Sequence, residues 1–295
     1  MQDGTTLHQR KIANIPNIIR YFGAGKGPFT SLGGVEGLGF IKTKFTNHSD
    51  DWPDFEIHMV SGSPASDDGQ TFRKVQGFTR EFWSQYYQPK LHSESFSLYP
   101  VMLRPKSKGY IELRSPNPYE PPIIEPRYLT HEEDIQKMVD AMKVGLSYRL
   151  FRLCSFSEVV ANFKRLTQLF EFDSSQISIA VGSTPGYRQL GAELFDTQMP
   201  GCEQYILWSD EYLACHARTY TATLYHPVGT ARMGPRKDKR SVVDSRLRVI
   251  GVKGLRVADG SIMPDIVSGN TNAPIIMIGN LKAIHSCGVS LQDLH

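Results

Sequence analysis

One histidine stands where it could act as a base. His226 lies in the run Tyr225–Thr230 (YHPVGT), directly after a predicted helix that begins with Ser209 as its N-cap and runs toward Leu224. Because a proline just past a helical pattern stops the helix, we expect His226 at the helix's C-terminal end, where the dipole favours the protonated form and burial opposes it. Such a histidine can accept a proton from a substrate hydroxyl. The alternative is a histidine that only caps the last carbonyls.

Two further runs combine small and polar residues with accessible backbone N–H groups. Ser268–Pro274 (SGNTNAP) leads into a predicted helix that starts near residues 272–274 and runs to about Cys287. Its N–H groups would favour a reduced flavin, a phosphate or a carboxylate, and Asn270 could donate to a developing alkoxide. Asp259–Ser261 follows a predicted strand, Leu255–Ala258, and its glycine permits close approach of a ligand. The alternatives are plain helix capping for the first run and a simple turn for the second.

Residues 225–279 as a whole resemble the C-terminal signature of the glucose–methanol–choline (GMC) flavoprotein oxidoreductases. The matching motifs stand in the family's order: YHPVGTARMG (225–234), VVD (242–244), LRV (247–249), GLRVADGSIMP (254–264) and GNTNAPIIMIG (269–279). Residues 104–109 and 126–129 resemble the opening of the family's substrate domain, and residues 27–37 resemble insect-type, glucose dehydrogenase-like members. Two positions depart from the pattern: Ala231 stands where many members have Cys, and Asn280 where Glu is usual.

The resemblance implies an FAD-dependent oxidation of the CH–OH group of a small-molecule alcohol or sugar. By position, His226 matches the family's catalytic histidine, which accepts the hydroxyl proton while hydride passes to flavin N5. Asn270 matches the partner that hydrogen-bonds the same oxygen. Four residues fall where members bring the chain against the flavin: Asp259, Gly260, Thr271 and Asn272. The implied electron acceptor is a quinone-like compound or O₂.

The same resemblance divides the chain into three regions. Residues 1–99 match part of the FAD and substrate-domain region, 100–240 the substrate domain, and 241–295 the segment that returns to the FAD domain. Family members begin with a strand, a G-x-G-x-x-G loop and a helix that bind the ADP half of FAD. Gly23–Gly27 follows a helical pattern instead of a strand, and Gly33–Gly39 has the wrong spacing, so both are predicted to be loops.

We therefore expect a C-terminal fragment that lacks the ADP-binding unit and binds FAD weakly by itself. Two alternatives stay open: a non-catalytic binding module derived from the same fold, and a flavin-containing lyase on the same scaffold. The expected fold is α+β, with a mostly antiparallel substrate-domain sheet flanked by helices and the C-terminal strand and helix of an incomplete FAD-binding domain.

Several segments must position these residues. Ile15–Phe22 has helical spacing, and Phe55–Val60 alternates as a strand does. Tyr99–Leu103 and Tyr110–Leu113 are predicted to pair as one β-hairpin, followed by a rigid connection, Pro116–Pro122. Thr130 and Glu133 form a capping-box pattern, which predicts that a helix begins there. Arg246–Ile250 is predicted to be a short strand before the strand Leu255–Ala258.

Composition and charge exclude several classes of protein. The 295 residues are 40% hydrophobic and 21% charged, which excludes a disordered chain, and the net charge of +3 predicts no nucleic-acid partner. The first residues are polar, which predicts no signal peptide, and no apolar stretch approaches the ~20 residues of a membrane span. The four cysteines lack metal-site spacing and predict buried thiols or one or two disulfides, with no metal site. The compartment and the substrate stay open.

Overall fold

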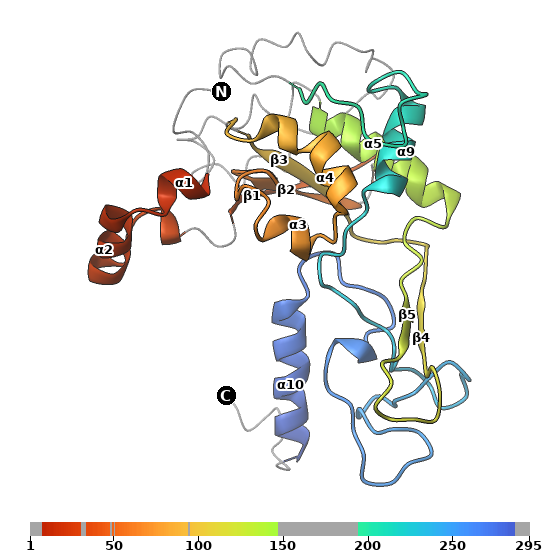
Figure 1. The fold of residues 1–295 in the computed structure, drawn as a ribbon. Helices are drawn as coiled ribbons and strands as arrows, with labels where there is room; N and C mark the ends of the chain where they lie inside the picture. Colours follow the sequence, from red (N-terminus) through yellow and green to blue (C-terminus); the bar gives the residue numbers. More distant parts are fainter. Residues whose placement is uncertain are drawn as a thin grey trace. The chain divides into compact units, whose positions relative to one another are not determined.

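The computed structural model describes residues 8–30, 34–47, 49, 51–93, 95–146 and 194–286 (Figure 1). The chain divides into two compact units: unit 1 comprises Met1–Met102 and Ile135–Ala222, and unit 2 comprises Leu103–Asp134 and Thr223–His295. Helices mix with antiparallel strands, as the sequence predicts. Among the described residues, no helix is both long and apolar enough to span a membrane.

Unit 1 contains a three-stranded antiparallel sheet in the order β1-β2-β3. The strands are β1 (Val35–Ile41), β2 (Phe55–Val60) and β3 (Ser97–Met102). The prediction of β2 is confirmed. The prediction of a loop at Gly33–Gly39 is wrong, because Gly37 and Gly39 pair with Met59 and Ile57 across the sheet, and this long-range pairing outweighs the weak strand preference of glycine.

The sheet buries one face against helix α5 (Glu132–Leu146). Residues alternate between the two faces of a strand, so Phe55 and Ile57 share the face that packs with Ala141 of α5. The other face of β2 carries Glu56 and His58, both buried, with 3.5 Å between the nearest imidazole nitrogen and carboxylate oxygen. The alternation in the sequence predicts the strand, but it does not predict that its polar face is buried.

The other helices in the described part of unit 1 are short. They are α1 (Gln9–Ile12), α2 (Ile15–Ala24), α3 (Phe72–Val75), α4 (Arg80–Tyr86) and α9 (Asp210–Thr219), with 3₁₀ turns η1 (Pro28–Thr30) and η2 (Gln88–Lys90). Helix α2 is confirmed, with the Asn14 side chain capping its start by accepting the Asn17 N–H. The predicted loop at Gly23–Gly27 is wrong in its first part, because α2 continues through Gly23 and ends where Gly25 adopts φ 60°.

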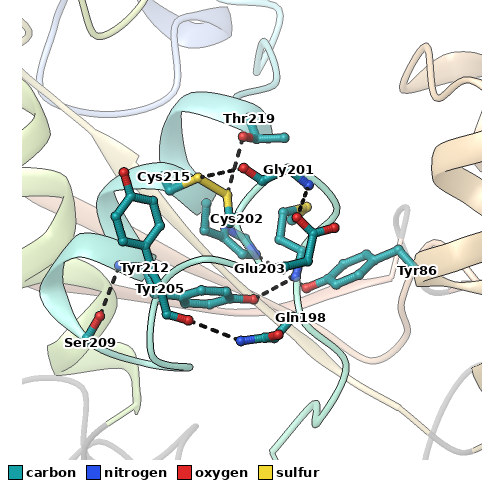
Figure 2. Close-up of a disulfide and its surroundings, with 12 residues drawn as sticks. Tyr86, Gln198, Gly201, Cys202, Glu203, Tyr205, Ser209, Tyr212, Cys215 and Thr219 are labelled. Carbon is teal, nitrogen blue, oxygen red and sulfur yellow. Dashed lines mark hydrogen bonds between the residues drawn. A yellow bond between two sulfur atoms is a disulfide. The ribbon is translucent and has the colours of Figure 1, made fainter.

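A disulfide fixes the chain that leads into α9. Cys202 and Cys215 are bonded, and the Ser209 hydroxyl accepts the Tyr212 N–H, which confirms the predicted N-cap (Figure 2). The buried Tyr212 hydroxyl accepts the Met199 N–H at 3.0 Å. A bridge that closes a loop of this size stabilises the fold by about 3 kcal/mol. The other two cysteines, Cys154 and Cys287, lie outside the described residues.

Aromatic side chains from α4, α9 and the residue after α9 form one cluster around the half-buried His216. Tyr86, Tyr212 and Tyr220 surround this histidine, and the Tyr86 hydroxyl lies 3.4 Å from its Nε2. Burial raises the pKa of the Tyr86 and Tyr220 hydroxyls above their ordinary value. Burial also lowers the pKa of His216 to about 4, so this imidazole is neutral at pH 7.

The burial of His216 predicts a loss of stability in acid. Its pKa is depressed in the folded chain, so between pH 6.5 and pH 4 the unfolded chain binds more protons and stability falls as the pH falls. From pH 7.5 to pH 5 the expected loss is about 2 kcal/mol. Urea unfolding at both pH values measures it. The variant His216→Gln keeps a hydrogen-bonding side chain that does not titrate, so between the two pH values it should lose about 2 kcal/mol less stability than the unchanged chain. Equal losses of stability in both proteins would contradict the prediction.

Unit 2 contains a small hairpin of β4 (Tyr110–Glu112) and β5 (Ile123–Glu125). The predicted hairpin between residues 99–103 and 110–113 is therefore wrong: β3 pairs with β2, and β4 pairs with β5 across the Pro116–Pro122 connection. The predicted strands Arg246–Ile250 and Leu255–Ala258 are reduced to single bridges such as Arg248 with Arg256.

Helices α5 and α10, each 15 residues long, begin in different ways. Helix α5 begins at Glu132, and the predicted capping box is wrong because the Thr130 hydroxyl donates to the Arg127 carbonyl while His131 Nδ1 accepts the Glu133 N–H. Helix α10 (Asn272–Ser286) begins where predicted. It packs Ile275 and Ile278 on a core that includes Val243, Ile262 and Met263.

Candidate functional site

His226 lies in a segment of unit 2 that is neither helix nor strand, and not at a helix end. Helix α9 ends at Thr219, so the prediction that His226 sits at its C-terminal end is wrong. The chain leaves the helical path early, because the Tyr220 backbone is already non-helical and the Thr221 hydroxyl donates back to the Ala217 carbonyl. Tyr225 adopts φ 62° and its N–H donates to the Thr223 hydroxyl at 3.0 Å, which turns the chain just before the half-buried His226.

The chain after His226 is fixed against residues 261–263. The Ala231 N–H donates to the Ser261 carbonyl at 2.9 Å, and the Met233 N–H donates to the Ile262 carbonyl at 2.8 Å. Gly229 adopts φ 86°, and a Cβ there would lie 3.3 Å from the Met263 carbonyl oxygen. These contacts hold the backbone that carries the imidazole, so its position does not depend on a helix.

Gly260 is the point where three segments meet. It begins a 3₁₀ turn, η4 (Gly260–Ile262), whose first N–H groups are capped by Asp259: its Oδ1 accepts the Ser261 N–H at 2.8 Å. A Cβ at the buried Gly260 would lie 3.2 Å from Cδ1 of Ile275 and 3.5 Å from the carbonyl oxygen of Pro227. The glycine thus lets α10 and the segment next to His226 approach each other closely.

The start of α10 presents the polar residues that the sequence singles out. The Thr271 carbonyl accepts the Ile275 N–H at 3.0 Å, so the buried Thr271 acts as the residue before the first turn. Asn270 and Asn272 on either side are exposed. The N–H groups at this end carry the positive pole of a 15-residue helix. Through Gly260 the structure brings this helix start close to the His226 segment.

A segment that sequence reasoning did not assign to the site holds the chain just before Asn270. Arg104 Nη1 donates to the Ser268 hydroxyl at 3.1 Å, and Lys108 Nζ donates to Asp265 Oδ1 at 2.9 Å. The same segment is fixed by Asp134, which accepts the N–H groups of Lys106 and Ser107. The available signal was the 104–109 run, which the resemblance marks as the opening of the substrate domain.

Asp244 holds the turn at residues 244–248 through hydrogen bonds. Its buried carboxylate accepts Nε of Arg248 at 2.9 Å, Nη2 of Arg236 at 3.0 Å and the backbone N–H of Arg246 at 3.0 Å. The Arg248 guanidinium is the main cause that holds the Asp244 pKa well below its usual range. The neighbouring Val243 is fully buried in the core on which α10 packs, so this turn supports the helix.

The arrangement offers a proton acceptor, a positive helix end and exposed polar side chains in one unit. A half-buried imidazole can take up a proton, and the N–H groups at the start of α10 can receive an electron-rich ring edge or a phosphate. Among the described residues of unit 2, no three His, Cys, Asp or Glu side chains bring their ligand atoms together as a metal centre would require.

Comparison with known proteins gives a consistent result. Residues 105–279 match the family model described as GMC oxidoreductase. Glucose dehydrogenase (FAD, quinone) of Drosophila melanogaster is 38% identical over 65% of this chain and 25% of its own length. Alcohol dehydrogenase (acceptor) of Pseudomonas putida is 37% identical over 64% of this chain and 27% of its own length. The chain therefore spans about a quarter of the length of these relatives.

Solved structures share the fold at lower sequence identity. A formate oxidase structure covers 100% of this chain and 45% of its own, with a TM-score of 0.67 and 21% identity. Pyridoxine 4-oxidase from Mesorbium loti covers 87% of this chain and 38% of its own, with a TM-score of 0.53 and 21% identity. The mixed helix and antiparallel sheet architecture predicted from the sequence is thereby confirmed.

Proposed function

Because this chain belongs to the GMC oxidoreductase family, we propose that it acts in the FAD-dependent oxidation of the CH–OH group of an alcohol or a sugar. The observation that carries the proposal is the convergence in unit 2 of the His226 segment, the Asp259–Gly260 turn and the start of α10 at Gly260. The relatives named above are, by their own names, a glucose dehydrogenase and an alcohol dehydrogenase, which supports this class of substrate.

In the proposed reaction His226 is the general base. An imidazole nitrogen takes the proton of the substrate hydroxyl and holds it, leaving a positive charge beside the oxygen that becomes a carbonyl. Asn270 donates its amide N–H to the same oxygen and fixes the substrate's orientation. The hydrogen bonds of Ala231 and Met233 keep the His226 backbone in place during this step.

The residues at the start of α10 fit a flavin cofactor. FAD, when bound, supplies the acceptor for the hydride. Asn272 and its backbone N–H stand at the positive helix end, which favours an anionic ring edge, and Asp259, Gly260 and Thr271 are the neighbouring residues that would support it. We propose a quinone-like compound or O₂ as the final electron acceptor; the name of the Drosophila relative supports the quinone.

The surface of α10 supports an assembly with further flavin-binding structure. While Ile275 and Ile278 face the core, Ile276 is 55% exposed and Met277 50% exposed on other sides of the same helix. A helix that is apolar on more than one side is normally buried on more than one side. This surface fits the remaining part of an FAD-binding domain.

Reconstitution tests the proposal. The chain would be purified with FAD, and separately co-expressed with the flavin-binding part of a GMC relative. We expect the second preparation to keep a flavin band near about 450 nm after desalting and to reduce a dye when glucose or a simple alcohol is added. A preparation that retains flavin but shows no substrate-dependent dye reduction would overturn the proposal. Product formation without flavin reduction would favour the lyase, and neither activity the binding module.

A further inference from the structure

Two histidines and an aspartate form a cluster in unit 1, outside the site described above. His8 precedes α1, Asp68 lies in the loop between β2 and α3, and His92 follows η2. Each residue offers one ligand atom, and these atoms all lie within 4.8 Å of one another. His92 Nδ1 lies 3.6 Å from Asp68 Oδ1. Three separate segments thus direct nitrogen and oxygen donors to one point.

Two polar atoms of these residues are buried without a hydrogen-bond partner. His8 is only 5% exposed, and its Nε2 has no partner; Asp68 Oδ1 is likewise buried and unsatisfied. Burying such an atom without a partner costs about 1–3 kcal/mol, so native structures rarely keep two of them side by side. A cation held between His8 Nε2 and Asp68 Oδ1 would satisfy both.

The carboxylate is already oriented for this role. Arg10 Nε donates to Asp68 Oδ2 at 2.6 Å, which leaves Oδ1 as the oxygen that faces His92. Residues that ligate metals are commonly oriented by a second hydrogen bond of this kind. Asp68 itself has a left-handed backbone conformation, with φ 56°.

The loop that carries Asp68 is held by hydrogen bonds and is tied to the segment that carries His8. Asp67 accepts the N–H groups of Gly69 and Thr71, and a Cβ at Gly69 would lie 2.5 Å from the Trp83 ring. The Gln9 N–H donates to the Ser66 carbonyl at 2.9 Å, which locks the residue after His8 onto the same loop. Two ligands are therefore preorganised.

The third ligand can adjust. The His92 side chain is 56% exposed and lies at the surface, so its ring can rotate without disturbing the core. Donor atoms that bind one zinc ion at ~2.0–2.2 Å lie ~3–4 Å from one another. The donor atoms of this cluster lie up to 4.8 Å apart, so they must approach one another by about 1 Å to bind the ion. Such a movement is small for an exposed imidazole.

We propose that His8, Asp68 and His92 bind one divalent transition-metal ion, with zinc the best match. Two imidazoles and one carboxylate are donors that zinc favours, whereas magnesium and calcium prefer sites made of oxygen. Water would fill the fourth position. The ion would join the start of α1 to the loop after β2 and to the turn after η2, and so act as a structural clamp on unit 1.

Metal titration of the full chain tests the proposal. After treatment with a chelator, zinc binding is measured by calorimetry and cobalt binding by visible absorption. We expect one zinc ion per chain, and at least about tenfold weaker binding in His92→Ala and in Asp68→Asn. His131→Asn is the matched control, because His131 is an exposed histidine of unit 2 and asparagine can still cap α5; its affinity should equal that of the unchanged chain.

The outcomes are separable. Far-ultraviolet circular dichroism verifies that each variant is folded. If His92→Ala does not fold, His92→Gln replaces it in the titration. Zinc should raise the melting temperature of the unchanged chain and not that of the His92 variants. An unchanged chain that binds no zinc, or a His92 variant that binds it as tightly, would overturn the proposal; so would magnesium binding of equal strength.

Discussion

Replacing His226 with alanine is expected to lower the turnover of the assembled holoenzyme by about 10²–10⁴-fold. The imidazole is the proposed acceptor of the hydroxyl proton, and alanine leaves that proton without an acceptor while hydride departs. The backbone should keep its place, because the hydrogen bonds from Ala231 and Met233 do not involve the imidazole. Steady-state dye reduction with the substrate found by reconstitution measures the loss.

The pH profile separates a base from a merely structural histidine. In the unchanged enzyme kcat/KM should fall in acid as the imidazole becomes protonated, and His226→Ala should lose this acidic limb. Added imidazole should restore part of the activity of His226→Ala, because a small base can enter the vacated space. His131→Asn serves as the control histidine and should retain full activity. A His226→Ala enzyme with undiminished turnover would contradict the assigned role.

The elements that the sequence predicts best are those with local signals. Ser209 precedes acidic residues and an apolar stripe, and α9 begins there. Pro274 stands in the first turn of α10, where a missing N–H costs nothing, and α10 begins two residues earlier. Phe55–Val60 alternates and is a strand. In each case the residues that specify the element lie within it.

The errors concern partners that are distant in the sequence. Residues 99–103 and 110–113 are close along the chain and both favour strands, so a local hairpin was the simplest pairing. Instead β3 pairs with β2, which ends 37 residues before β3 begins, because Leu98 and Met102 then join Phe55 under α5. Nothing in the local pattern encodes that shared core.

The candidate site shows the same division. The motif run identifies His226, Gly260 and the start of α10, and the structure brings these segments together. It does not identify Arg104 and Asp134, which act on the site through hydrogen bonds to backbone and hydroxyl groups far along the chain. The His8 cluster is equally invisible, because its ligands are 60 and 24 residues apart and form no local motif.

Asp134→Ala is expected to destabilise the chain by about 3 kcal/mol. Asp134 is 0% exposed, and its carboxylate accepts the Lys106 N–H at 3.0 Å, the Ser107 N–H at 2.7 Å and the Ser107 hydroxyl at 2.6 Å. Hydrogen bonds to a charged acceptor contribute about 1.5–3 kcal/mol each, and water recovers part of this loss because Lys106 is exposed. Urea unfolding of both proteins measures the difference.

The neighbouring Glu133→Ala is the matched control for this prediction. Glu133 lies in the same first turn of α5 and also contacts Lys106, but through the exposed ammonium group of that lysine. An exposed ion pair contributes at most about 1 kcal/mol, so Glu133→Ala should cost far less than Asp134→Ala. Similar losses of stability in the two variants would mean that the negative charge near the start of α5 stabilises the chain, and not the buried hydrogen bonds to the backbone.

Hydrogen exchange locates the effect of Asp134→Ala and connects it to the site. In the unchanged chain the Lys106 and Ser107 amides should exchange slowly, and in Asp134→Ala they should exchange faster by the factor that the lost free energy implies. Because Arg104 and Lys108 of the same segment hold Ser268 and Asp265, faster exchange should extend to the residues just before Asn270. Faster exchange confined to α5 would instead mean that Asp134 stabilises only its own helix and has no part in positioning Asn270.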